Sequence, residues 1–77
     1  MSKLDKLLAK ARNNPEGLKF SEFESLLTLS GWQHVRTRGS HRIYKSAHGL
    51  RLPIQPDGKM AVGYQVKQFL KVYDNEN

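Results

Sequence analysis

The residues best able to do chemistry in this sequence lie around His41. Its imidazole is the one kind of side chain here that titrates near neutral pH, so it can accept and donate protons. Arg36, Arg38 and Arg42 lie close to it in sequence, and guanidinium groups bind phosphate oxygens through paired hydrogen bonds. Cleavage of RNA needs a base for the 2′-hydroxyl proton, an acid for the departing 5′ oxygen and cations for the charge on phosphate. One histidine among arginines can supply much of this chemistry.

The same segment fits two other functions. A small RNA-binding domain without catalysis would use the same arginines for phosphates and aromatic side chains for base stacking. A protein-interaction domain would instead place this basic surface against an acidic partner. A lone histidine beside a turn is more often a surface residue without a task. Replacement of His41 separates these functions, because a domain that only binds RNA keeps its affinity without the imidazole.

The positive charge of the chain is concentrated in one stretch. Thirteen Lys and Arg against seven Asp and Glu give a net charge of +6, and the isoelectric point is near 9.9. No acidic residue lies between Glu24 and Asp57, and that stretch holds all three histidines. Such a concentration indicates a polyanion partner, with RNA as the first candidate, rather than a domain that is merely soluble and basic.

Length and composition exclude several classes of protein. A chain of 77 residues forms one domain, 1–77, and is too short for an enzyme with separate substrate and cofactor domains. The absence of cysteine excludes disulfides, thiolate nucleophiles and sulfur-ligated zinc, and it fits a cytoplasmic location. No apolar run approaches the roughly 18 residues of a membrane span, so we expect no membrane partner.

The three histidines are spaced by seven residues, as His34, His41 and His48. They would form a stripe and a candidate metal site only if they lay on one helix. Gly39, Gly49 and the β-rich composition between them argue against a helix. We therefore expect no metal site and no cofactor.

Apolar periodicity predicts three helices. The first covers about residues 2–12, with Ser2 as its N-cap. The second begins at Ser21, where Ser21 and Glu24 form a capping box, and it ends near Gly31. The third covers about 63–73, and a polar tail at about 74–77 is expected to be disordered.

Three short strands are predicted between the second and third helices. β-branched and aromatic residues indicate strands at 32–37 and 41–45, and alternation indicates a third at 50–54. Pro53 cannot donate a backbone hydrogen bond, so this third strand either lies at a sheet edge or ends there. A loop is expected at 55–58. These elements give an α+β fold in which a three-stranded antiparallel sheet has helices on one face and leaves the other to solvent or a ligand.

The turn between the first two strands decides which side chains share a face. A three-residue turn, from Arg38 to Ser40, would place Val35 and Ile43 on the core side. It would place four side chains on the solvent side: His34, Arg36, Arg42 and Tyr44. A two-residue turn would reshuffle these pairings, because a slip of one residue exchanges the faces. The predicted RNA-binding residues around the candidate catalytic His41 are Arg36, Arg38, Ser40, Arg42, Tyr44 and Lys45.

The order of residues from Gly31 to Tyr44 resembles the HicA (YcfA-like) toxin family. The family pattern has a glycine, an aromatic residue, then hydrophobic and basic residues, followed by Gly-Ser-His and an apolar pair. This chain carries the tripeptide as Gly39-Ser40-His41. The segment 66–70 of the last helix is also similar, and the resemblance covers roughly residues 13–72.

This resemblance implies a double-stranded-RNA-binding-like fold of order α-β-β-β-α, here with an extra N-terminal helix. It implies the toxin of a type II toxin–antitoxin module: an mRNA interferase, which is a metal-independent endoribonuclease that blocks translation. The family's catalytic histidine falls on His41. The implied partners are mRNA and a HicB-type antitoxin that covers the active site. Toxin and antitoxin together would repress their own operon, so DNA would be contacted only through the antitoxin.

One position departs from the family pattern. Many members carry a second histidine after the proline of the third strand, where this chain has Pro53-Ile54-Gln55. Gln55 cannot titrate, so activity here is expected to be weaker or differently organised. Ser40 and Tyr44 are substitutes by position only.

Overall fold

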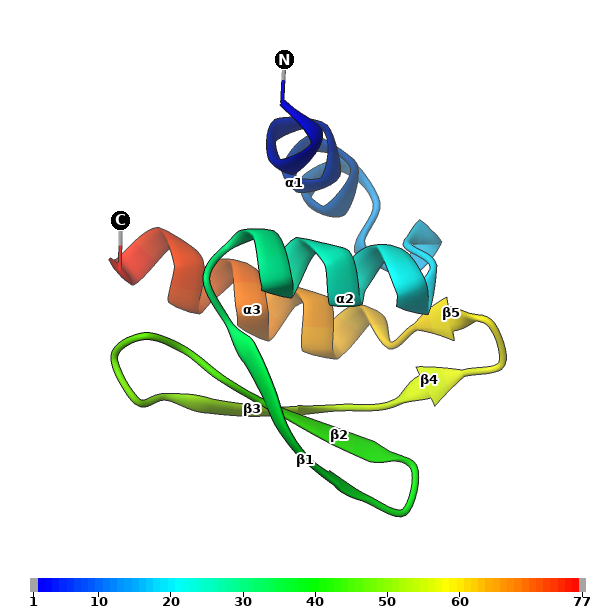
Figure 1. Ribbon diagram of the computed structural model, residues 1–77. Coiled ribbons are helices and arrows are strands. Elements are labelled where there is room, and N and C mark those ends of the chain that lie inside the picture. The colour runs from blue at the N-terminus through cyan, green and yellow to red at the C-terminus, as the bar shows by residue number, and fades with distance from the viewer. Residues whose placement is uncertain (1, 77) are drawn as a thin grey trace.

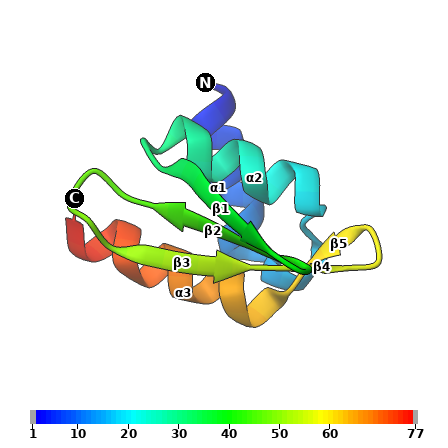
Figure 2. The ribbon, with the colours of Figure 1, turned by 60° about the horizontal axis from the view of Figure 1, so that its bottom comes forward.

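All three helices lie on the same side of a three-stranded antiparallel sheet in the computed structural model, which describes residues 2–76 (Figure 1). Figure 2 shows the sheet in front of the helices, with its outer face uncovered. In chain order the elements are α1 (Lys3–Asn13), η1 (Pro15–Gly17), α2 (Phe20–Leu29), β1 (Gln33–Arg38), β2 (His41–Lys45), β3 (Arg51–Ile54), β4 (Pro56–Asp57), β5 (Met60–Ala61) and α3 (Gly63–Glu76). The predicted α+β fold of double-stranded-RNA-binding type is confirmed, with α1 as the extra N-terminal helix.

Helix α1 forms as the sequence predicts. Its N-cap is Ser2, whose Oγ accepts a hydrogen bond from the backbone N–H of Asp5 at 3.1 Å. One face of the helix is buried, at Leu7, Leu8 and Ala11. The helix ends before Pro15, which opens the short η1 turn because proline fits the first position of a helical turn.

Helix α2 begins one residue earlier than predicted, and the predicted capping box of Ser21 and Glu24 is wrong. The N-cap is Lys19, whose backbone N–H donates to Glu22 Oε1 at 2.9 Å. A contact outside the helix fixes this start. The backbone N–H of Phe20 donates to the carbonyl oxygen of Lys59, just before β5, at 2.9 Å. Glu24 is thereby free to contact the strands.

The turn between β1 and β2 has two residues, Gly39 and Ser40, rather than the three predicted. Gly39 has a φ of +58°, a left-handed conformation that glycine adopts without strain. Arg38 pairs directly with His41, whereas a three-residue turn would have paired Thr37 with His41. In the structure Thr37 pairs with Arg42.

A β-bulge in β1 also changes which side chains share a face of the sheet. The register shifts between His34, which lies opposite Tyr44, and Arg36, which lies opposite Ile43. His34 and Arg36 therefore point to opposite faces, although regular alternation would put them on the same face. The prediction that Val35 and Ile43 share the core side is wrong, since Val35 in the bulge is 46% exposed.

Aromatic rings fill the space between the helices and the sheet. The side chain of Phe69 in α3 is fully buried. The centroid of its ring lies 6.1 Å from that of Phe23, 6.2 Å from that of Trp32 and 5.8 Å from that of Tyr73. Such tilted and edge-to-face pairs are favourable beyond the area they bury. The core therefore lies wholly on the helix side of the sheet.

Two segments expected to be irregular have regular structure. The predicted loop at 55–58 contributes to a small hairpin in which Pro56 of β4 pairs with Ala61 of β5. The tail expected to be disordered is helical as far as Glu76, and Asp74 in it accepts two hydrogen bonds from Arg12. Asn77 lies outside the described residues. No helix within residues 2–76 is long and apolar enough to span a membrane.

Two ion pairs attach α1 to the other helices. Lys10 Nζ lies 2.9 Å from Glu22 Oε2, and Arg12 Nη2 lies 2.7 Å from Asp74 Oδ1. The hydrogen bond from Lys10 lowers the pKa of Glu22, and that from Arg12 lowers the pKa of Asp74. A carboxylate whose pKa is lowered by folding stabilises the fold at pH values above its pKa in the unfolded chain. This contribution is lost as the pH falls through its pKa in the folded protein.

We therefore expect the unfolding temperature to decrease as the pH falls below the ordinary pKa values of 4.5 for Glu22 and 3.8 for Asp74. The double variant Glu22→Gln/Asp74→Asn should be less stable near pH 7 and should lose less on acidification. Thermal unfolding followed by circular dichroism checks this. Asp57→Asn is the control, since Asp57 forms no ion pair within residues 2–76. Equal acid sensitivity of the double variant and the wild type would contradict the expectation.

Candidate functional site

His41 is the first residue of β2 and directly follows the two-residue turn. Its side chain is exposed, and its cross-strand partner is Arg38. The Cβ atoms of directly opposite residues lie about 5 Å apart, so a guanidinium and an imidazole at these positions can contact the same small group. The imidazole therefore stands in solvent beside an arginine and outside the apolar core.

Alternation along the strands assigns His41 to the uncovered face of the sheet. Tyr44 of β2 and Leu52 of β3 are buried beneath the helices, so the residues at alternate positions point away from them. The register then adds Arg36 and Arg38 of β1. We call this surface the open face, and its side chains are Gln33, Arg36, Arg38, His41, Ile43, Lys45, Arg51 and Pro53.

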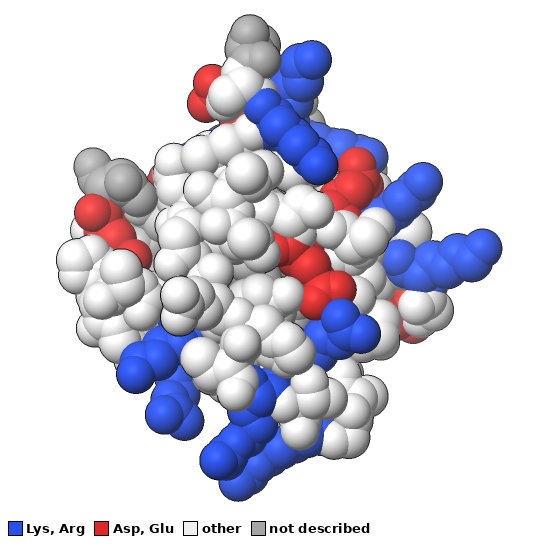
Figure 3. Space-filling model, in the orientation of Figure 1, with Lys and Arg blue, Asp and Glu red and all other residues white. Residues whose placement is uncertain are grey.

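The open face is positive and carries no described carboxylate. Its four cations are Arg36, Arg38, Lys45 and Arg51. None of them forms an ion pair with a described residue. Figure 3 shows Lys and Arg side chains projecting at the bottom of the view, where the sheet lies in Figure 1. Unpaired cations around a small apolar strip are suited to hold a phosphate chain and its bases.

Arg42 and Tyr44 lie on the helix side, so their predicted place on the solvent face is wrong. The Arg42 guanidinium binds the Glu24 carboxylate of α2 at 2.8 Å, and the Tyr44 hydroxyl donates to it at 2.7 Å. The Arg42 guanidinium also lies over the ring of Phe20, 5.4 Å from its centroid. Burial, followed by the bond to Glu24, raises the pKa of Tyr44 well above its ordinary value. These contacts anchor β2 to α2 and keep both side chains off the open face.

The other two histidines lie away from His41. His34 stacks on Tyr44 with ring centroids 5.3 Å apart, and its Nε2 lies 2.9 Å from Thr37 Oγ1. His48 lies in the exposed turn after β2, where its backbone N–H donates to Ser46 Oγ at 3.2 Å. In the part of the chain that the structure describes, no group of three His, Asp or Glu side chains is placed to hold a metal ion.

Two further positions from the sequence analysis, Ser40 and Gln55, lie next to strand ends. Ser40 is exposed in the turn next to His41, where its hydroxyl can contact a bound group. Gln55 follows β3 and is half-buried, with its backbone N–H donating to Gln65 Oε1 at 3.0 Å. Gln55 therefore helps to join the sheet to α3.

The sequence-based list of site residues omitted four members of the open face: Gln33, Ile43, Arg51 and Pro53. Arg51 and Pro53 alternate with buried Leu52 and Ile54 in β3. That alternation is visible in the sequence and could have placed Arg51 on the face. Ile43 could not be found in this way, because its placement depends on the length of the β1–β2 turn.

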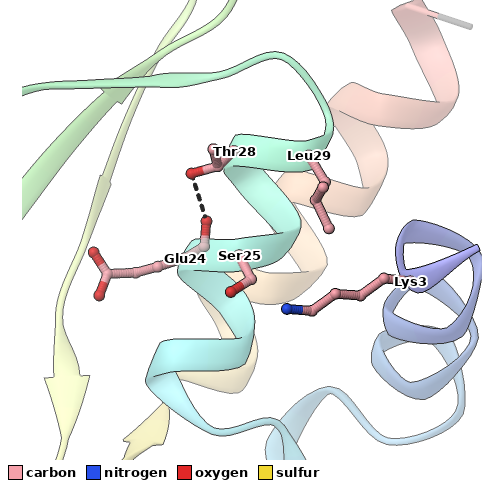
Figure 4. Close-up of a pocket in the computed structure, with 5 residues that line it drawn as sticks. All are labelled: Lys3, Glu24, Ser25, Thr28 and Leu29. Carbon is pink, nitrogen blue, oxygen red and sulfur yellow. Dashed lines mark hydrogen bonds between the residues drawn. The ribbon is translucent and has the colours of Figure 1, made fainter.

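A pocket on the helix side is distinct from the open face (Figure 4). It lies between α1 and α2 and is lined by Lys3, Glu24, Ser25, Thr28 and Leu29. Figure 4 shows the Lys3 ammonium pointing towards α2, whereas the Glu24 carboxylate points away towards the strands. This pocket therefore presents one charged group and no histidine, so it is a weaker candidate than the open face for acid–base chemistry.

A family model described as the HicA toxin of bacterial toxin–antitoxin matches residues 20–73. The matched segment begins with α2, contains the whole open face and ends within α3, whereas α1 precedes it. Comparisons with curated proteins and with solved structures found no match.

Proposed function

Because the chain belongs to the HicA toxin family of bacterial toxin–antitoxin systems, we propose that it is an mRNA interferase, an endoribonuclease that cuts mRNA without a metal and so blocks translation. The observation that carries the proposal is the exposed imidazole of His41 opposite Arg38 on the open face. That face offers a proton acceptor and cations that no described carboxylate neutralises. RNA supplies both the phosphate charge and a 2′-hydroxyl that can act as a nucleophile.

The proposed reaction uses groups already present on the open face. The neutral imidazole of His41 accepts the proton of the 2′-hydroxyl, and the 2′ oxygen forms a bond to phosphorus. The bond from phosphorus to the 5′ oxygen breaks, and that oxygen takes the proton back from the imidazolium. Arg36 and Arg38 stabilise the negative charge that grows on the phosphate. The products are a 2′,3′-cyclic phosphate and a 5′-hydroxyl.

We further propose that a HicB-type antitoxin neutralises the protein by covering His41. An acidic antitoxin surface would complement the cations of the open face and exclude RNA from the same place. The antitoxin would also provide the DNA contact through which the pair represses its operon.

A second candidate function is RNA binding without cleavage, and one observation favours it. Among the described side chains of the open face, His41 is the one imidazole, and Gln55 stands where the family's second histidine is expected. A single imidazole must then serve both proton transfers. In a binding domain, replacing His41 would leave both RNA affinity and the cellular effect nearly unchanged.

The double variant Arg36→Ala/Arg38→Ala tests the proposal. We expect it to bind single-stranded RNA more weakly and to cut it more slowly, because two phosphate contacts are lost. The slope of log K against log salt concentration should become shallower by about 1.4, since each contact with a single strand contributes about 0.7. Fluorescence anisotropy over a salt series measures the slope, and gel analysis of labelled RNA measures cleavage.

Lys3→Ala/Lys6→Ala is the matched control. Both lysines are exposed on α1, which lies across the helices from the open face (Figure 1), and the variant loses the same charge. Its salt slope and cleavage rate should remain those of the wild type. Equal losses in the two double variants would show that only overall charge matters and would contradict a specific role for the open face.

A further inference from the structure

A groove of about 490 Å³ runs between the edge strand β3 and helix α3. Figure 2 shows β3 and α3 running side by side at the margin of the sheet. Seven residues line the groove: Arg51, Leu52, Tyr64, Lys67, Gln68, Lys71 and Val72. The proposed reaction uses none of them.

The groove is positively charged and carries no carboxylate in its lining. Arg51, Lys67 and Lys71 contribute three cations, and none of them forms an ion pair within residues 2–76. Lys67 and Lys71 are four residues apart on α3, so they lie on one face of the helix and repel each other. Two like charges held together without a counter-charge are suited to an anionic ligand.

Tyr64 adds an aromatic surface at one end of the groove. Tyr64 is 68% exposed, whereas the other exposed large hydrophobic residues that the structure describes are each 46% exposed. Its hydroxyl accepts a hydrogen bond from Gln68 Nε2 at 3.2 Å, which limits the positions of the ring. An exposed, partly fixed ring beside cations is the arrangement on which single-stranded nucleic acids stack their bases.

Arg51 joins the groove to the open face. It lines the groove and is also the cross-strand partner of Lys45 on the open face. Positive charge therefore continues from His41 across the sheet and around its edge. The outer edge of β3 is poorly suited to an additional strand, because Pro53 has no backbone N–H to donate. These features favour a nucleic-acid chain over a peptide strand.

We propose that the groove binds the part of a single-stranded RNA that extends beyond the cut site. Phosphates lie against Arg51, Lys67 and Lys71, and a base stacks on Tyr64. The inference rests on the proposed function, since it takes RNA as the substrate of the open face. It adds a second contact region that makes affinity depend on the length of the RNA.

Length-dependent binding tests this groove in a His41→Ala background, in which cleavage is expected to be slow. The probes are labelled single-stranded RNAs of about 5 and about 12 nucleotides, lengths within the range that one small domain contacts. Lys67→Ala/Lys71→Ala should weaken binding of the longer RNA roughly tenfold and leave the shorter RNA unaffected. Tyr64→Ala should weaken binding of the longer RNA by about fivefold or more, and Tyr64→Phe should restore it. Lys3→Ala/Lys6→Ala is again the charge-matched control.

The outcomes separate this inference from the proposed function. If the wild type cuts RNA and the groove variants bind the longer RNA as the control does, the groove inference is wrong and the function stands. If neither RNA binds and the wild type does not cut, both fail. Reduced binding of a HicB-type antitoxin with unchanged RNA affinity would assign the groove to a protein partner and overturn the inference.

Discussion

Replacement of His41 by alanine is expected to slow RNA cleavage by about 10²- to 10⁴-fold, the contribution of a positioned general acid or base. Induced expression should then no longer arrest growth. RNA affinity should change little, because Arg36 and Arg38 remain on the open face. The fold should also persist, since the His41 side chain is exposed and has no hydrogen bond to a described residue.

Single-turnover cleavage of a labelled RNA and growth after induction are the measurements. His48→Ala is the matched control, because His48 is an exposed histidine in a turn away from the open face. It should cut RNA and arrest growth as the wild type does. A His41→Ala protein that cuts at the wild-type rate would exclude acid–base catalysis by this residue. If neither the wild type nor His41→Ala cuts RNA, and both bind it and arrest growth equally, the result would favour RNA binding without cleavage.

Replacement of Phe69 by alanine should destabilise the protein by about 3–5 kcal/mol, the usual cost of removing a buried phenylalanine. The residue is fully buried, and its ring meets three other aromatic rings. Stability of about 0.05–0.15 kcal/mol per residue gives roughly 4–12 kcal/mol for a chain of 77 residues. The loss is therefore a large part of the total, and the variant should be partly or wholly unfolded at 37 °C.

Urea unfolding followed by tryptophan fluorescence measures this effect, because Trp32 packs against Phe69. Phe69→Leu retains more of the buried volume, so it should lose less and give a complete transition even if the alanine variant is unfolded. Tyr64→Ala removes an exposed aromatic from the same helix and should change stability by no more than about 0.5 kcal/mol. Similar losses at positions 64 and 69 would contradict the placement of Phe69 at the centre of the core.

The helices were predictable because their signals are local. The stripe of Leu7, Leu8 and Ala11 and the stripe of Val66 and Phe69 each follow helical spacing, and all five residues are buried. The start of α2 was harder to predict from the sequence. Glu22 and Glu24 both lie near the predicted start, and the sequence does not show that Glu24 is bound by Arg42 and Tyr44 from β2. Tertiary contacts decide which carboxylate caps the helix.

The sequence could not predict which face of the sheet each side chain of the β1–β2 hairpin occupies, because one residue more or less in the turn or in a bulge exchanges the faces. The turn has two residues instead of three, and Val35 forms a bulge that the alternation of side chains does not reveal. His34, Arg42 and Tyr44 were consequently placed on the wrong face. Arg36 and Arg38 lie close to His41 in the sequence, and the structure leaves His41 exposed beside Arg38, directly after the turn of Gly39 and Ser40.

The central claim is that His41 activates the 2′-hydroxyl of RNA at the open face. The most direct test is cleavage of an RNA that carries a single 2′-deoxynucleotide on the 5′ side of a mapped cut, in the presence of a metal chelator. The account predicts no cleavage at that position, while the unmodified RNA yields 2′,3′-cyclic phosphate and 5′-hydroxyl ends. Unchanged cleavage at the deoxy position, leaving 5′-phosphate ends, would contradict it.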